Sequence, residues 1–264
     1  MSIICKNCDN YSVSAQELQK RVNYIKPYFI HFSTPLKIVI SLADGVLEGV
    51  DRTGYMNFDP KWLNTDPNVD PVFFHEYAHL VFGHLSNLLT VIPENNYFID
   101  IINQEIKVRK AMEATPLKNI AEHKRLKKEA RFLKYESEED PLATVSRPYN
   151  ELFADLVACL ATKNPNAMAE VEKDSLRSFV PGIPYPEHYE KQRDEHVHFF
   201  KTRQFIWQKY IDGGMTLTSA QNILRITYQA AWKEIKLRVN KERLQNLSLI
   251  EIDQRFYSAL NIAL

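Results

Sequence analysis

The segment PVFFHEYAHLVFGH, residues 71–84, places two histidines four positions apart in an otherwise apolar run. An α-helix repeats every 3.6 residues, so His75 and His79 project from one face and can bind one metal ion together. Glu76 is offset from His75 by about 100° around the helix. That offset suits a carboxylate that contacts a water on the metal and leaves the ion to the histidines.

The boundaries and faces of this segment indicate a buried helix. Asp70 is a suitable N-cap and Pro71 a suitable first helical residue. If the histidines were merely packed in the core, Glu76 would be a costly buried charge without a partner, whereas a metal accounts for that charge. His84, nine residues after His75, falls on the far side of the helix. We therefore expect His84 to be structural or at the surface.

A catalytic zinc ion usually has three protein ligands and one open position, so the histidine pair needs a third residue. In the metzincin pattern a glycine and a histidine would stand where this chain has Phe82 and Leu85, which excludes that class. The segment YNELFADLVA offers Glu151 and Asp155, four apart on one helical face. The spacing permits Glu151 to bind zinc while Asp155 accepts a hydrogen bond from the far ring nitrogen of a ligating histidine.

Together, H-E-x-x-H and the N-E-x-x-x-D that begins at Asn150 resemble the ligand motifs of the gluzincin metallopeptidases, the thermolysin-like clan. The segment DPNVDPVFFHEYAH is similar to the lead into the first zinc helix of that clan. The resemblance covers scattered blocks from about Gly54 to Tyr210. It implies one Zn²⁺ per chain, and the ligands that it implies are His75, His79 and Glu151.

The same resemblance extends to RDEHVHFFKTRQFIWQKY, which looks like the D-x-H segment of some gluzincins and the helix that follows it. By position, the histidine that steadies the oxyanion is His196, and its partner is Asp194. His198 is a competing choice for this role. Tyr149, next to the third ligand, is a further candidate, for which a place in the core is the alternative.

The N-terminal part of the chain predicts a small sheet. Apolar residues at helical spacing from about Ala15 to Tyr28 predict a helix, and residues 35–50 and 54–60 predict strands. In gluzincins the substrate usually pairs with an edge strand above the zinc helix. We expect residues 54–60 to provide that edge.

The remainder of the chain predicts helices. Residues 104–136 are charged and lysine-rich and predict two exposed helices, either a solvated face or a basic binding surface. An apolar helix is predicted to start near Pro148. Three more segments with helical periodicity are 199–211, 226–239 and 249–264.

These elements predict an α+β fold. The gluzincin resemblance implies a zincin-like form of it, in which a small antiparallel or mixed sheet packs on the H-E-x-x-H helix and a mostly helical C-terminal half follows. We expect three parts: an N-terminal α+β subdomain (1–90), a charged helical insertion (91–147) and a helical subdomain with the third ligand (148–264).

Composition limits the classes of partner. The 264 residues include 33 basic and 33 acidic side chains, a balance that argues against a dedicated nucleic-acid binder. We find neither 18 uninterrupted apolar residues nor a basic start followed by an apolar run. We therefore expect no membrane span and no Sec signal, which leaves a cytoplasmic protein or one exported by another route. A signal removed before residue 1 is the alternative.

Three cysteines are too few for a disulfide scaffold in a chain of this length. Cys5 and Cys8 form one C-x-x-C, which we interpret as a surface pair, oxidised or free. A redox or zinc-knuckle role is the alternative. Cys159 lies in an apolar run, where a small buried thiol is expected.

The resemblance implies a zinc metalloendopeptidase that acts on a peptide or protein. Zinc would polarise the scissile carbonyl and activate a water, while Glu76 takes the proton and delivers it to the leaving amine. Two alternatives remain open. One is an exported toxin or effector protease with a single protein target, and the other is a zinc-binding or regulatory module of the same fold without catalysis.

Overall fold

The computed structural model describes residues 2–32, 37–43, 49–50, 55–63, 66–85, 119–138, 141–192, 194–240 and 247–264, with scattered residues between 104 and 115. The chain divides into two compact units. One combines residues 1–85 with residues 148–264, and the other comprises residues 86–147. The two flanks of the charged segment therefore form a single unit, and all the candidate site residues belong to it.

The strands form one sheet in the order β1-β2-β4-β3. The pairs β1–β2 and β2–β4 are parallel, whereas β3 pairs antiparallel with β4, so the sheet is mixed. β4 lies between β2 and β3, which corrects the expectation that residues 54–60 form an edge. The edge on that side is β3. The bounds are β1 Ser2–Lys6, β2 Lys37–Leu42, β3 Gly49–Val50 and β4 Tyr55–Phe58.

The sheet buries alternate side chains. In β2, Ile38, Ile40 and Leu42 are fully buried, and in β4 Phe58 is buried while Asn57 is exposed. Successive side chains of a strand point to opposite faces, so one face of β2 and one face of β4 supply core residues. Helix α1 (Ala15–Ile25) contacts β1, and α2 (Pro71–Leu85) contacts β3 and β4.

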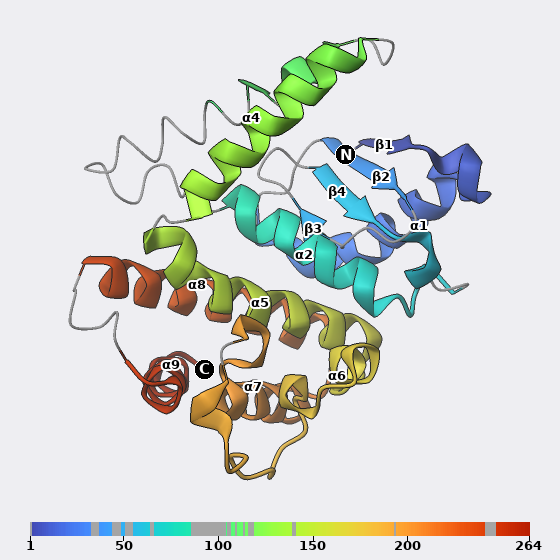
Figure 1. Ribbon diagram of the computed structural model, residues 1–264. Helices are drawn as coiled ribbons and strands as arrows, with labels where there is room; N and C mark the ends of the chain where they lie inside the picture. The colour runs from blue at the N-terminus through green and yellow to red at the C-terminus, as the bar shows by residue number, and fades with distance from the viewer. Residues whose placement is uncertain are drawn as a thin grey trace. The chain divides into compact units, whose positions relative to one another are not determined.

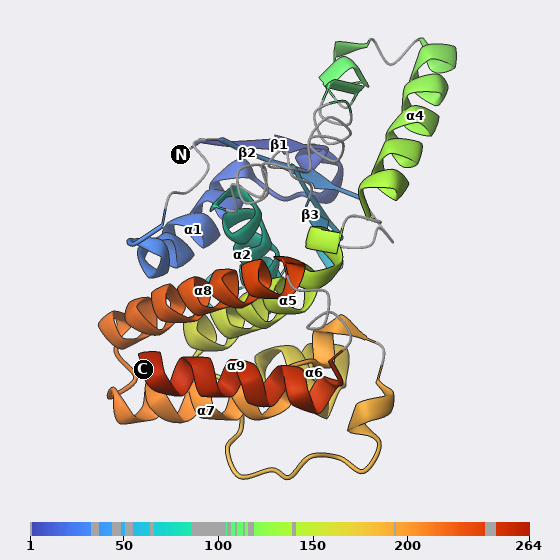
Figure 2. The same cartoon turned by 90° about the vertical axis from the view of Figure 1, so that its left-hand side faces the viewer.

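Helix α2 begins where the sequence predicts. Oδ1 of Asp70 accepts a hydrogen bond from the Phe73 N–H at 3.2 Å, which confirms Asp70 as the N-cap and Pro71 as the first helical residue. Oδ2 of Asp70 also accepts from Nε of Arg21 at 2.6 Å, which ties α1 to the start of α2. Figures 1 and 2 both show α2 between the sheet and α5.

Helix α5 extends over Pro141–Thr162 and contains Pro148 in its interior, so it starts earlier than the predicted position near Pro148. A proline inside a helix removes one backbone hydrogen bond and disfavours, but does not forbid, a continuous helix. Leu142 and Val145 are buried in the turns before Pro148. Their burial accounts for the longer helix.

The three helices predicted near the C-terminus are confirmed, and a short helix that the sequence did not indicate precedes them. Phe153 of α5 forms ring contacts with Phe29, Phe82 and Tyr228, which join four segments of the chain in one aromatic core. The mixed sheet and these helices confirm an α+β fold. The helices are α6 Ala167–Glu172, α7 Phe200–Asp212, α8 Leu217–Asn240 and α9 Leu249–Ala263.

The second unit contains α4 (Ile120–Glu138). Leu126 and Ala130 of α4 pack with Val108 in a small apolar cluster. On an exposed face of the same helix, Arg125 pairs with Glu122 and Glu129 at 2.8 Å each. This part of the predicted segment 104–136 is therefore an amphipathic helix with a solvated charged face.

The structure also shows the state of the three cysteines and tests for membrane-spanning helices. Cys5 and Cys8 form a disulfide, and Cys159 is a buried free thiol, as its apolar surroundings predict. No helix among the described residues is both long enough and apolar enough to cross a membrane.

Candidate metal centre

Three side chains from two helices converge in the first unit. His75 and His79 come from α2, and Glu151 comes from α5. The Nε2 atoms of the two histidines are 2.9 Å apart, and each lies 3.4 Å from Oε2 of Glu151. Helices α2 and α5 are neighbours in both views (Figures 1 and 2). The distances show that the histidine pair of α2 faces the Glu151 carboxylate of α5.

The donor set fits a zinc ion. Two imidazole nitrogens and one carboxylate oxygen are the ligands of many catalytic zinc sites. A tetrahedral ion with bonds of about 2.1 Å holds its ligand atoms about 3.4 Å apart. The two separations from Glu151, 3.4 Å each, match this spacing, and the two histidine nitrogens, 2.9 Å apart, lie closer together than it. His75, His79 and Glu151 together could hold one such ion.

The charges of His79 and Glu151 shift each other's pKa values. Burial by itself would lower the pKa of His79, but the neighbouring Glu151 carboxylate raises it to about 10. Burial would raise the pKa of Glu151, yet the charge on His79 and hydrogen bonding to His75 and His79 hold it well below its usual range. Without a metal ion, Glu151 is therefore ionised and His79 protonated, and a bound metal would displace the proton from His79.

Asp155 supports the ring of His75 from behind. Its Oδ1 lies 3.0 Å from Nδ1 of His75, the nitrogen that faces away from the cluster. Burial would raise the pKa of Asp155, but Arg177 and Arg203 hold it far below its usual range. A proton on Nδ1, on the side of this carboxylate, would leave the lone pair of Nε2 free for a metal.

Two more side chains act on the ring of His79. Asn150, directly before Glu151, contributes hydrogen bonding that raises the pKa of His79, and the charge on Glu76 raises it further. Glu76 is only 6% exposed. It lies within electrostatic reach of the cluster without being one of the three ligands, which is the place expected of a proton-transferring carboxylate.

A third histidine approaches the cluster from a separate segment, the short 3-10 helix η7 (Glu195–Val197). Nε2 of His196 lies 3.2 Å from Oε2 of Glu151. On the other side of the ring, Nδ1 lies 2.5 Å from Oδ1 of Asp194, which also accepts the backbone N–H of His196 at 3.0 Å. The ring is thus oriented by Asp194 and directed at the cluster.

The surroundings of His196 differ from those of His198 and Tyr149, the two other candidates for the oxyanion donor. The ring of His198 lies beside Phe199, and burial and the nearby Arg238 lower its pKa to about 4. Of His196 and His198, it is His196 whose ring lies against the Glu151 carboxylate.

Tyr149 has its place in the core. Its ring packs on Phe199 and Phe256 at centroid distances of 4.7 and 5.0 Å. Burial raises its pKa to about 12. His84 lies in α2, but its side chain is outside the described residues.

Two arginines complete the centre, and sequence reasoning missed both. Arg177 donates to Oδ1 of Asp155 at 2.5 Å and to Oδ2 at 3.2 Å, and Arg203 donates to Oδ2 at 2.6 Å. Arg203 lies in a segment with helical periodicity, and an arginine on a helix ordinarily reaches solvent. Its position on the apolar face of that helix is the one sequence feature that indicates its burial. Arg177 ends a short 3-10 helix (Ser175–Arg177), in a part of the sequence without such a signal.

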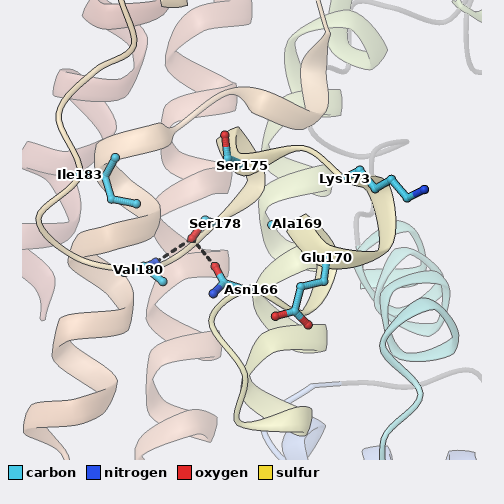
Figure 3. Close-up of a pocket in the computed structure, with 8 residues that line it drawn as sticks. All are labelled: Asn166, Ala169, Glu170, Lys173, Ser175, Ser178, Val180 and Ile183. Atoms are coloured by element: carbon cyan, nitrogen blue, oxygen red, sulfur yellow. Dashed lines mark hydrogen bonds between the residues drawn. The ribbon is translucent and has the colours of Figure 1, made fainter.

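A separate hollow of about 430 Å³ lies against α6 and the chain that follows it (Figure 3). Among its lining residues, the Ser178 hydroxyl donates to Oδ1 of Asn166 at 2.6 Å and accepts from the Val180 N–H at 3.1 Å. None of the candidate site residues lines this hollow. It is therefore distinct from the metal centre.

Comparisons of the chain with protein-family models, with curated proteins and with solved structures found no match. The function is accordingly inferred from the centre itself.

Proposed function

We propose that the protein is a zinc-dependent metallopeptidase of the gluzincin type, with a zincin-like arrangement of sheet and helices around its centre. The observation that carries the proposal is the convergence of His75, His79 and Glu151 on one point, with Glu76 and His196 beside them. The histidines and Glu151 would hold the ion. Bound there, Zn²⁺ would polarise the scissile carbonyl and lower the pKa of a water molecule.

Glu76 is the proposed general base. It is next to His75 in α2 and buried, and its charge acts on His79. From this position it would accept the proton of the attacking water and deliver it to the leaving amine. The carboxylate of Glu151 could not take this role, because it is a ligand.

His196 is the proposed donor to the oxyanion. Asp194 holds Nδ1 of His196, and Nε2 faces the cluster. From this position His196 would donate a hydrogen bond to the oxygen that becomes negative in the transition state. Removal of one such donor typically lowers the rate by about 10² to 10³.

A peptide substrate would add to the sheet at β3. This strand is antiparallel to β4, lies at the edge and contacts α2, the helix of the two histidines. An extended peptide on an edge strand gains backbone hydrogen bonds, and its amide groups would pass along α2.

The test is hydrolysis of casein and of a library of internally quenched peptides by the zinc-loaded wild type and by Glu76→Gln. We expect cleavage by the wild type and a loss of at least about 10² in Glu76→Gln, with zinc retained in both. Cleavage confined to one protein of a lysate would identify the single-target effector. Zinc retention without cleavage of any of these substrates would contradict the peptidase and indicate a non-catalytic zinc module.

A further inference from the structure

Arg203 joins two parts of the metal centre that are separate in sequence. It lies in the first turn of α7 and is fully buried. One nitrogen of its guanidinium, Nη1, donates to Oδ2 of Asp155 at 2.6 Å. The other two donate to backbone carbonyls: Nη2 to His196 at 2.7 Å and Nε to His198 at 3.2 Å. A single planar group thus contacts both the support of His75 and the segment of His196.

The backbone between the His198 carbonyl and the start of α7 is strained. Phe199 has a φ of 66°, in the left-handed region, although it is a bulky residue and fully buried. Such a conformation is strained for a bulky side chain and persists only where the surroundings impose it. The bonds from Arg203 to His196 and His198, together with the Arg203 N–H donating to the Phe199 carbonyl at 2.8 Å, impose it here.

Arg177 provides the internal comparison. It also contacts Asp155 and is also buried, with a second, longer approach of 3.9 Å to Glu172. Its bonds neutralise the same carboxylate, but among the described residues they do not extend to the His196 segment. Both arginines therefore neutralise the Asp155 carboxylate, and of the two it is Arg203 that also binds the backbone of the His196 segment.

We propose that Arg203 is a positioning residue that fixes the ring of His196 relative to the metal ligands, through its simultaneous bonds to Asp155 and to the His196 and His198 carbonyls. This role rests on the proposed function where it concerns catalysis. The positioning of the His196 ring does not rest on the proposed function, because it is a property of the metal-free chain. Lysine at this position would keep a positive charge near Asp155 but would lack the planar fork that reaches three acceptors in different directions.

The geometric part is tested on the metal-free protein by NMR of the His196 ring, in Arg203→Lys and in the matched control Arg177→Lys. We expect the His196 ring resonances to move in Arg203→Lys and to stay at their wild-type positions in Arg177→Lys. Arg203→Gln, which keeps one amide donor, serves as a second variant if Arg203→Lys loses its helical circular dichroism. Unmoved His196 resonances in the folded Arg203 variant would overturn the proposal.

The catalytic part is tested by a double-mutant cycle on peptide hydrolysis. We expect Arg203→Lys to lower kcat by about 10² with little change in KM, because it misplaces a donor that acts in the transition state. Combined with His196→Ala, it should cause almost no additional loss, since both changes remove the same interaction. Fully additive losses would overturn the role of Arg203. If no substrate is cleaved at all, the proposed function fails while the NMR result still decides the geometric part.

Discussion

Nδ1 of His75 and Oδ1 of Asp155 lie 3.0 Å apart, although the two residues belong to different helices. Asp155 is fully buried and is held ionised by two buried arginines. The contact turns the His75 ring so that Nε2 faces His79 and Glu151. The orientation of one proposed ligand therefore depends on a carboxylate that is not itself a ligand.

The first prediction concerns this carboxylate. Asp155→Asn should weaken zinc binding by about 10- to 100-fold, because the ligand loses the partner that orients it and raises its basicity. The measurement is competition with a chelating dye. Asp194→Asn is the matched control, since Asp194 orients His196 rather than a proposed ligand. A wild-type zinc affinity in Asp155→Asn would show that the contact has no such role.

The second prediction concerns the start of α2, the helix that carries His75 and His79. Asp70→Ala should lower the free energy of unfolding by about 3 kcal/mol, because it removes an N-cap and the carboxylate that neutralises the buried Arg21. Urea denaturation measures the change. Ser14→Ala removes the exposed cap of α1 and should cost only about 1 kcal/mol. Equal losses in the two variants would mean that the buried ion pair contributes nothing.

The third prediction concerns the thiols. Burial raises the pKa of Cys159 to about 12, so at pH 8 the thiol stays protonated and inaccessible. A thiol-reactive dye should label no cysteine in the native protein and one in urea, with the Cys5–Cys8 disulfide intact. After reduction, three cysteines should react in urea. Labelling of Cys159 in the native protein would contradict its burial.

Local features of the sequence predicted much of the fold. The cap at Asp70, the proline after it and the spacing of His75 and His79 are short-range signals, and the helix they predict begins at that point. The convergence of Glu151 with the histidines was implied by a resemblance to ligand motifs, and the structure brings the three atoms together.

Features that depend on long-range pairing were not predictable. The position of β4 inside the sheet follows from its pairing with both β2 and β3, which segment composition does not encode. The start of α5 before Pro148 depends on what buries Leu142 and Val145. The D-x-H resemblance favoured His196 and left His198 as a competitor, because which of the two rings lies against Glu151 depends on how the loop folds.

The central claim is that His75, His79 and Glu151 hold one zinc ion. Elemental analysis of the purified wild type, His79→Ala, Glu151→Ala and Glu76→Gln tests it most directly. We predict about one zinc per chain in the wild type and in Glu76→Gln, and a loss of the metal in both ligand variants. Full zinc retention in Glu151→Ala would contradict the assigned third ligand, and a wild type that binds no zinc would contradict the metal centre as a whole.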